Sequence, residues 1–89
     1  MKIKLELFGA SRDFSDKDHL ELNVKDKASV DDLRNEIIKY LDKNFKGNES
    51  FIKVVKSSAF CSENNEIITD NYKIIKDQKI GIIPPIGGG

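Results

Sequence analysis

The chain has 89 residues, enough for one domain with a single small core and too few for a two-domain nucleotide enzyme or a large barrel. Fifteen Lys and Arg residues balance fifteen Asp and Glu residues, so the formal net charge is zero. A protein without net positive charge lacks the bulk field that draws nucleic acid to a basic domain. The charged fraction of 34% and the hydrophobic fraction of 38% are typical of a globular protein with a thin core.

The sequence also indicates the compartment. No apolar run approaches the ~20 residues of a membrane-spanning helix, and Met1 is followed by Lys2 without the apolar stretch of a signal peptide. The one cysteine, Cys61, can form neither an internal disulfide nor a multi-thiolate metal site. We therefore expect a cytoplasmic protein that binds no metal, no membrane and no nucleic acid.

Two segments near the N-terminus alternate apolar residues with charged or polar ones, which is the period of a half-buried strand. They are residues 2–8 and residues 19–25, and the ten residues between them predict an antiparallel hairpin with a wide connection. The apolar positions expected to face the core are Ile3, Leu5, Leu7, Leu20, Leu22 and Val24.

The period changes to that of a helix over about residues 30–44. Ser29 is a favourable N-cap, and Asp31 and Asp32 place negative charge in the first turn, where the helix dipole favours it. We expect the helix to stop near Gly47. The apolar side chains that recur three and four residues apart are Val30, Leu33, Ile37, Tyr40 and Leu41.

The C-terminal half contains three further strand candidates. They are the apolar run 51–56, the short segment 66–69 and the final run 79–83. Two prolines end the last of these, because proline donates no hydrogen bond to a ladder. The intervening residues 57–65 are rich in turn-forming Ser and Asn and support no assignment.

The order strand, strand, helix, strand, short strand, strand predicts an α+β fold of the ubiquitin-like β-grasp type. Its mixed sheet has four to five strands, with the first and last paired in parallel at the centre and one main helix across one face. We divide the chain into a β-grasp domain, residues 1–83, and an extended tail, residues 84–89. The core residues expected beyond the hairpin are Val30, Leu33, Ile37, Val54, Ile80 and Ile82.

The body of the domain offers little for catalysis. His19, the only histidine, lies on the outward side of an alternating strand, where a lone imidazole is a surface group. Cys61 has no neighbouring histidine or cationic cluster to activate it, so we interpret it as an apolar filler. Asp31 and Asp32 are adjacent in a helix and therefore do not face each other. The sequence contains no phosphate-binding loop, metal-ligand spacing or nucleophile elbow.

The C-terminal segment differs from the body. Pro84 and Pro85 hold the chain extended as it leaves the last strand, and Ile86 can anchor in an apolar pocket of another protein. Gly87–Gly89 lack a Cβ and can therefore enter a channel too narrow for other residues. The five residues after Pro84 reach roughly 17 Å, enough to enter a partner's active site. A flexible linker or a cloning scar is the alternative interpretation.

The residues from Ile83 to Gly89 resemble the Pro-Pro-hydrophobic-x-Gly-Gly terminus of the MoaD-type small subunits of molybdopterin synthase. Residues 8–12, Phe-Gly-Ala-Ser-Arg, resemble the aromatic-small-x-x-Arg segment that follows the first strand in that family. The resemblance extends over the whole chain. A terminal Gly-Gly alone is shared with thiamine sulfur carriers, tRNA-thiolation carriers and ubiquitin, and the Pro-Pro pair narrows the resemblance.

Three segments depart from the family pattern. Asp77-Gln78-Lys79 stands where the family has Asp-Gly-Asp-Glu, and Val55-Lys56 stands where its third strand has Val-Asn. Residues 57–65 have no match in the family pattern. These departures concern turn geometry and partner surfaces and leave the chemistry of the tail unchanged.

The resemblance implies a sulfur-donating subunit that is not itself catalytic. A partner related to ubiquitin-activating enzymes would use ATP to adenylate Gly89, and a sulfur donor protein would convert it to a thiocarboxylate. The large, catalytic synthase subunit would then pass the sulfur to a pyranopterin precursor, within a heterotetramer. The chain itself would bind no cofactor. The residues implied in partner docking and tail insertion are Phe8, Pro84, Pro85, Ile86, Gly87 and Gly88.

Three other functions are compatible with the same tail. A carrier for thiamine synthesis or tRNA thiolation would use identical chemistry at Gly89 with a different acceptor enzyme. A ubiquitin-like modifier would use the same adenylation and end in an isopeptide bond to a target lysine. A plain interaction module, in which the glycines are incidental, would use neither. The Pro84-Pro85 pair favours the molybdopterin pathway over the other sulfur carriers.

Overall fold

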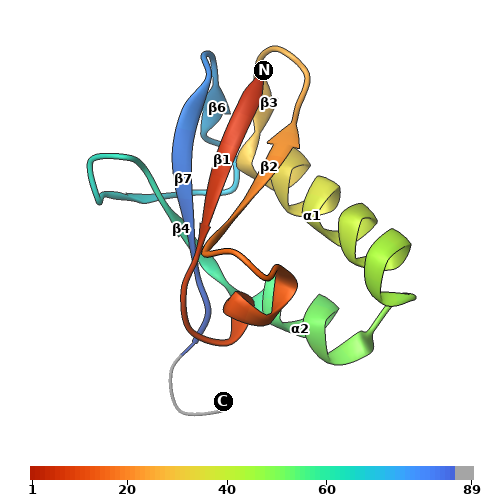
Figure 1. Cartoon of the computed structure of the whole chain (residues 1–89). Helices are drawn as coiled ribbons and strands as arrows, with labels where there is room; N and C mark the ends of the chain where they lie inside the picture. Colours follow the sequence, from red (N-terminus) through yellow and green to blue (C-terminus); the bar gives the residue numbers. More distant parts are fainter. Residues whose placement is uncertain (86–89) are drawn as a thin grey trace.

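The computed structural model describes residues 1–85 (Figure 1). Ten elements follow one another along this part of the chain. The first five are strand β1 (Lys2–Leu7), a 3-10 helix (Gly9–Phe14), strands β2 (His19–Asn23) and β3 (Ala28–Ser29), and helix α1 (Val30–Phe45). The others are helix α2 (Glu49–Ser57) and strands β4 (Ala59–Cys61), β5 (Ile67–Ile68), β6 (Lys73–Ile74) and β7 (Gln78–Ile83).

The main sheet has five strands in the order β2-β1-β7-β4-β5, and β3 and β6 form a separate two-stranded sheet. The first strand, β1, pairs in parallel with the last, β7, with Leu5 opposite Ile80 and Leu7 opposite Ile82. All other pairs in both sheets are antiparallel. Helix α1 runs along one side of the sheet (Figure 1). The predicted α+β architecture, with a mixed sheet and a parallel central pair, is confirmed.

The core lies between the sheet and α1, and most of the predicted core residues are buried in it. Leu22 and Val54 are the exceptions, because both are only half-buried and pack against the margin of the cluster. Leu22 belongs to β2, an edge strand of the sheet. The buried side chains that the sequence did not predict include Phe14, Val55, Phe60 and Ile74.

Residues 51–56, predicted as a strand, form most of helix α2 instead. The Asn48 side chain accepts a hydrogen bond from the Phe51 N–H at 3.1 Å and so begins the helix. Phe51 and Val55 are one helical turn apart, and the Phe51 ring packs against those of Phe14 and Phe45, each at 5.1 Å between centroids. Helical spacing therefore places this apolar run against the core. The comparison of residues 55 and 56 with a third strand was wrong for the same reason.

Residues 57–65, which the sequence left unassigned, contain a strand of the main sheet. Strand β4, Ala59–Cys61, pairs with β7 on one side and with β5 on the other. Phe60, which is buried, is its inward-facing side chain. The strand is too short for its alternation to stand out between the flanking serines.

Helix α1 begins and ends as predicted. The Ser29 hydroxyl accepts a hydrogen bond from the Asp32 N–H at 3.1 Å, and the Asp32 carboxylate accepts one from the Ser29 N–H at 3.0 Å. These hydrogen bonds hold the pKa of Asp32 below its usual value. At the other end Lys46 and Gly47 adopt positive φ angles of 55° and 69°, which terminate the helix.

Arg34 joins α1 to the end of α2, a role that the sequence did not reveal. Its guanidinium donates to the carbonyl oxygens of Val55 at 2.6 Å and Ser58 at 2.9 Å, and pairs with the Asp70 carboxylate at 2.6 Å. The same group lies 4.8 Å from the centroid of the Phe60 ring. It thereby caps the carboxyl end of α2 and positions the start of β4.

Truncation of Leu33 tests the helix–sheet packing. Leu33 is fully buried, so Leu33→Ala should lower the free energy of unfolding by ~2–5 kcal/mol through lost contacts and the remaining cavity. Urea unfolding followed by circular dichroism measures this change. A loss below ~0.5 kcal/mol, the size of an ordinary surface effect, would contradict the assigned helix face.

Removal of the Arg34 side chain tests the α1–α2 junction. Arg34→Ala removes the guanidinium donor from the Val55 and Ser58 carbonyls and leaves Val55 only the 3.3 Å hydrogen bond from the Ser58 N–H, so the free energy of unfolding should fall by about 2 kcal/mol. The matched control is Lys39→Ala, which breaks only the exposed 3.4 Å pair with Glu36 and should cost less than ~0.5 kcal/mol. Equal urea midpoints for the two variants would show that Arg34 holds nothing together.

Candidate docking surface at the root of the tail

The main sheet has one face against α1 and one face turned away from it. Residues alternate between the two faces along each strand, so Lys79, Gly81 and Ile83 of β7 lie on the outer face while Ile80 and Ile82 are buried in the core. Strand pairing extends this outer face across the sheet. Gly81 is opposite Glu6 of β1 on one side and opposite Cys61 of β4 on the other, and Cys61 is in turn opposite Ile67 of β5.

The outer face is apolar over the C-terminal half of β7 and over β4 and β5, next to the point where the tail departs. Phe8, Ile67 and Ile83 are 45%, 65% and 36% exposed, whereas Cys61 is buried among its neighbours. Exposed apolar side chains gathered in one place on a small protein mark a surface for a partner. We call this surface the apolar strip, and its residues are Phe8, Ala59, Cys61, Ile67, Gly81 and Ile83.

The remainder of the outer face, over β1 and β2, is charged. The Lys79 ammonium pairs with the Glu6 carboxylate at 2.8 Å, and this hydrogen bond raises the pKa of Lys79. His19 lies on the outer face as predicted, but its side chain is only 22% exposed, with its Nδ1 atom 2.9 Å from the Asp18 carboxylate. The hydrogen bond from His19 lowers the pKa of Asp18. These pairs give the apolar strip a polar border.

A hydrogen-bonded corner fixes the backbone of Phe8. The Phe8 N–H donates to the Ser11 hydroxyl oxygen at 3.0 Å, and the Ser11 hydroxyl donates to the Phe8 carbonyl at 2.7 Å. Ser11 is fully buried. Gly9 follows with a φ of +56°, a conformation that residues with a Cβ rarely adopt. The turn into the 3-10 helix therefore leaves the Phe8 ring on the outer face.

The corner also contacts the end of β7, and here one predicted docking residue is corrected. Pro84 is buried, so it cannot form part of an exposed patch, whereas Pro85 is exposed. A Cβ added to Gly9 would lie 3.8 Å from both Cδ and Cγ of Pro84. That distance is an ordinary van der Waals contact, so the corner lies beside Pro84, and it is the positive φ that favours glycine at position 9. Of the other predicted docking residues, Phe8 is exposed, and the predictions for Ile86–Gly89 lie outside the described residues.

Sequence reasoning missed most of the apolar strip. The alternation of residues 79–83 could have placed Ile83 and Gly81 beside Lys79 on the outer face. The sequence analysis considered only the core-facing residues of this strand, Ile80 and Ile82. Cys61 and Ile67 had no such signal, because their strands are short. Cys61 is buried as the filler interpretation expected, although it lies on the outer face.

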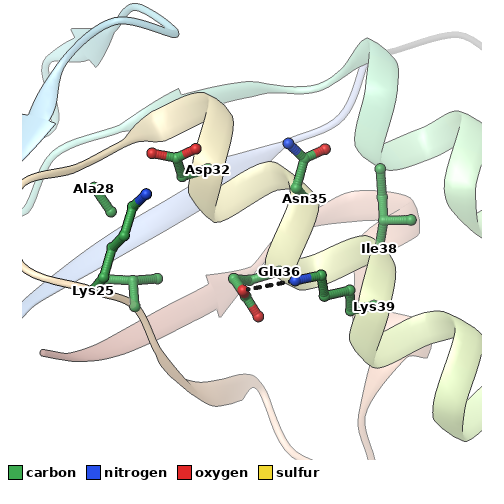
Figure 2. A pocket seen from close by; sticks show the side chains of 8 residues that line it. Lys25, Ala28, Asp32, Asn35, Glu36, Ile38 and Lys39 are labelled. Carbon is green, nitrogen blue, oxygen red and sulfur yellow. Dashed lines mark hydrogen bonds and ion pairs between the residues drawn. The ribbon is translucent and has the colours of Figure 1, made fainter.

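The hollow shown in Figure 2 is formed by residues 24–39, which are distant in sequence from the apolar strip. It has a volume of about 580 Å³ beside α1, with Val24, Ala28 and Ile38 among its lining residues. Its charges balance, since Lys25 and Lys39 face two carboxylates, and Lys39 bonds to Glu36 at 3.4 Å. Within residues 1–85 no group of His, Cys, Asp and Glu is arranged to hold a metal ion.

A conservative test addresses the corner. Ser11→Ala removes both hydrogen bonds to the Phe8 backbone, so the free energy of unfolding should fall by ~1–2 kcal/mol and the Phe8 amide proton should exchange faster with solvent. Urea unfolding and hydrogen exchange measure the two effects. Ser15→Ala is the control, since Ser15 only accepts an exposed bond from the Lys17 N–H and its loss should cost less than ~0.5 kcal/mol. Unchanged exchange at Phe8 would show that Ser11 does not fix the corner.

Solved structures with the same fold include the three that follow. A Pyrococcus furiosus protein described as a candidate molybdopterin converting factor, subunit 1, aligns with a TM-score of 0.69 at 23% identity, covering 96% of this chain and 98% of its own. Small archaeal modifier protein 1 from Haloferax volcanii aligns at 0.67 and 13%, covering 96% and 98%. Caldiarchaeum subterraneum ubiquitin aligns at 0.61 and 18%, covering 100% and 98%. These likenesses confirm the ubiquitin-like β-grasp fold.

Sequence comparison adds the family. No curated protein matches the chain significantly. No helix within residues 1–85 is long and apolar enough to cross a membrane. The sequence model of the ThiS family matches residues 5–89, which is nearly the whole chain and includes the tail. The chain therefore belongs to the ThiS family of ubiquitin-like sulfur carriers and modifiers.

Proposed function

We propose that this protein is the sulfur-carrying small subunit of a molybdopterin synthase, with Gly89 as the residue that bears the sulfur. The observation that carries the proposal is the Pro84-Pro85 exit from β7 beside the apolar strip. Pro84 is buried and lies beside Gly9, so the end of β7 and the corner pack together at the start of the tail. A partner that docks on the apolar strip receives the tail at a fixed point.

The chemistry at Gly89 begins with activation. A carboxylate is a poor electrophile, and attack of its oxygen on the α-phosphate of ATP gives an acyl adenylate and releases pyrophosphate. The persulfide sulfur of a donor protein then attacks the acyl carbon, and AMP leaves. A thiol finally cleaves the sulfur–sulfur bond, so that a thiocarboxylate remains on Gly89. Its sulfur is ionised at neutral pH and polarisable, which makes it an effective nucleophile.

The reacting groups are divided between this chain and its partners. An adenylating enzyme supplies the ATP site, and the large synthase subunit supplies the acid–base groups and the pocket for the pyranopterin precursor. This chain supplies the reactive end and the apolar strip. Because a dithiolene contains two sulfur atoms, two carriers that each bear a thiocarboxylate are needed for each product. A heterotetramer with two small and two large subunits is in keeping with this requirement.

Carriers for thiamine synthesis or tRNA thiolation, and protein modifiers, would use the same adenylation. The likeness to small archaeal modifier protein 1, at 13% identity, and to Caldiarchaeum subterraneum ubiquitin, at 18% identity, concerns the fold alone and does not select among these functions. A modifier differs in its product, since its glycine carboxylate ends in an isopeptide bond to lysine. The tests below therefore use the product formed, and not activation alone, as the deciding readout.

Deletion of Gly89 tests the carrier role. The deletion shortens an extended tail by roughly 3.4 Å, and a misplacement of about 1 Å can already cost ~100-fold in a reaction. The shortened chain should fold normally, accept no sulfur and support no molybdopterin synthesis. Intact mass after incubation with the adenylating enzyme, ATP and a sulfur donor measures the exchange of one oxygen for one sulfur. The yield of molybdopterin with the large subunit measures the transfer of that sulfur to the product.

Ile86→Asp separates docking from chemistry. This variant should lose affinity for the large subunit in calorimetry, because a charge replaces an apolar anchor, while its thermal stability stays that of the wild type.

Normal thiocarboxylate formation and normal product yield from the Gly89 deletion would contradict the carrier mechanism. A wild-type chain that gains sulfur but transfers it only to another acceptor, or that forms isopeptide bonds, would contradict the molybdopterin role.

A further inference from the structure

Gly81 occupies an unusual place for a glycine. It lies inside β7, the central strand, with β1 hydrogen-bonded on one side and β4 on the other. Its φ is not positive, so the backbone conformation does not require a glycine. A glycine inside a strand weakens the strand, and it commonly marks a place where another group approaches the backbone closely. The position is also buried, although its outward neighbours on the strand are exposed.

The group that approaches is the ring of Phe8. A Cβ added to Gly81 would lie 3.0 Å from Cε2 and 3.7 Å from Cδ2 of Phe8, and 2.8 Å from Sγ of Cys61. Carbon atoms of side chains pack at about 3.5–4.0 Å, so a methyl group at residue 81 would displace the ring, the thiol, or both. The Phe8 ring therefore lies over the bare backbone of Gly81.

Phe8 is thus held at both ends although 45% of it is exposed. Ser11 fixes its backbone through two hydrogen bonds, and Gly81 provides the space in which its ring lies. An exposed aromatic side chain that is already immobilised loses less conformational freedom when a partner binds, which improves affinity. Cys61 is buried beside it and has less freedom to move than the ring, which faces solvent on one side.

We propose that Gly81 is a positioning residue that preorganises the Phe8 ring for docking of the partner that receives the tail. This inference depends on the proposed function, because it takes Phe8 as an anchor in the complex with the large synthase subunit. Any larger residue at position 81 would lift the ring from the sheet and let it rotate. The apolar strip would keep its composition and lose its fixed shape.

The first measurement concerns the free protein and needs no partner. An aromatic ring over a backbone shifts the nuclear magnetic resonance of the protons beneath it, so the Gly81 α-protons should resonate upfield of ordinary strand glycines. Phe8→Leu should abolish the shift, and the control Phe45→Leu, at a ring remote from the outer face, should leave it unchanged. An α-proton shift that persists in Phe8→Leu would contradict the proposed position of the Phe8 ring over Gly81, which we call the ring seat.

The second measurement concerns binding. Gly81→Ala should weaken calorimetric affinity for the large subunit about tenfold, which corresponds to ~1.4 kcal/mol. Its thermal stability should also fall, because the new methyl carbon would lie 2.8 Å from the sulfur of the buried Cys61. In a Phe8→Leu background the same substitution should cost far less, since the two residues act together. Cys61→Ala combined with Gly81→Ala removes the thiol collision alone and should not restore affinity. Full rescue by Cys61→Ala, or additive losses from Gly81→Ala and Phe8→Leu, would overturn the proposal.

The two measurements separate the inference from the function beneath it. A ring-dependent α-proton shift in a wild-type protein that fails to bind the large subunit would refute the molybdopterin role and, with it, the docking purpose of the seat. A missing shift in a protein that binds and transfers sulfur normally would refute the seat alone. If Gly81→Ala fails to fold, the α-proton shift of the wild-type protein still decides the outcome, because it is measured without that substitution. Gly81→Ser in the Cys61→Ala background then replaces Gly81→Ala in the binding measurement.

Discussion

The parallel pairing of β1 with β7 is the constraint on which the rest of the molecule depends. In a parallel pair both strands end at the same edge of the sheet, and the register places Leu7 opposite Ile82. The carboxyl ends of β1 and β7 lie at the same edge (Figure 1). Phe8, the residue after β1, therefore lies next to the last residues of β7, where the tail begins. A parallel pair needs a long connection. Helix α1 lies within that connection and covers the inner face of the sheet.

The two faces of this sheet have opposite tasks, and strand register keeps them apart. A slip of one residue between β1 and β7 would invert one strand relative to the other, either burying Glu6 and exposing Leu5 or burying Lys79 and exposing Ile80. The fully buried inner face makes such a slip costly, so the register is strongly determined. The outer face inherits its pattern from that register. Its apolar part lies over β7, β4 and β5, and its charged part lies over β1 and β2.

Strict alternation and helical spacing are strong local signals, which explains why β1, β2, α1 and β7 were predictable. The run at residues 51–56 failed because its β-branched residues favour a strand, while the spacing of Phe51 and Val55 suits a helix equally well. The site was harder. Pro84 lies beside Gly9, 75 positions earlier in the sequence, and no local pattern contains such a contact. Ser11 and Arg34 likewise act on distant or backbone partners.

Energetics explain why the apolar strip points to association rather than to stability. Apolar side chains stabilise a fold in proportion to the area that folding removes from water, roughly 25 cal/mol per Å². The exposed portions of Phe8, Ile67 and Ile83 remain in water after folding and contribute nothing in this way. Gly81 and the Ser11 corner nevertheless hold the Phe8 ring in place, at a cost in strand propensity and side-chain freedom. A rigid, exposed aromatic side chain is of energetic use only when a second protein covers it.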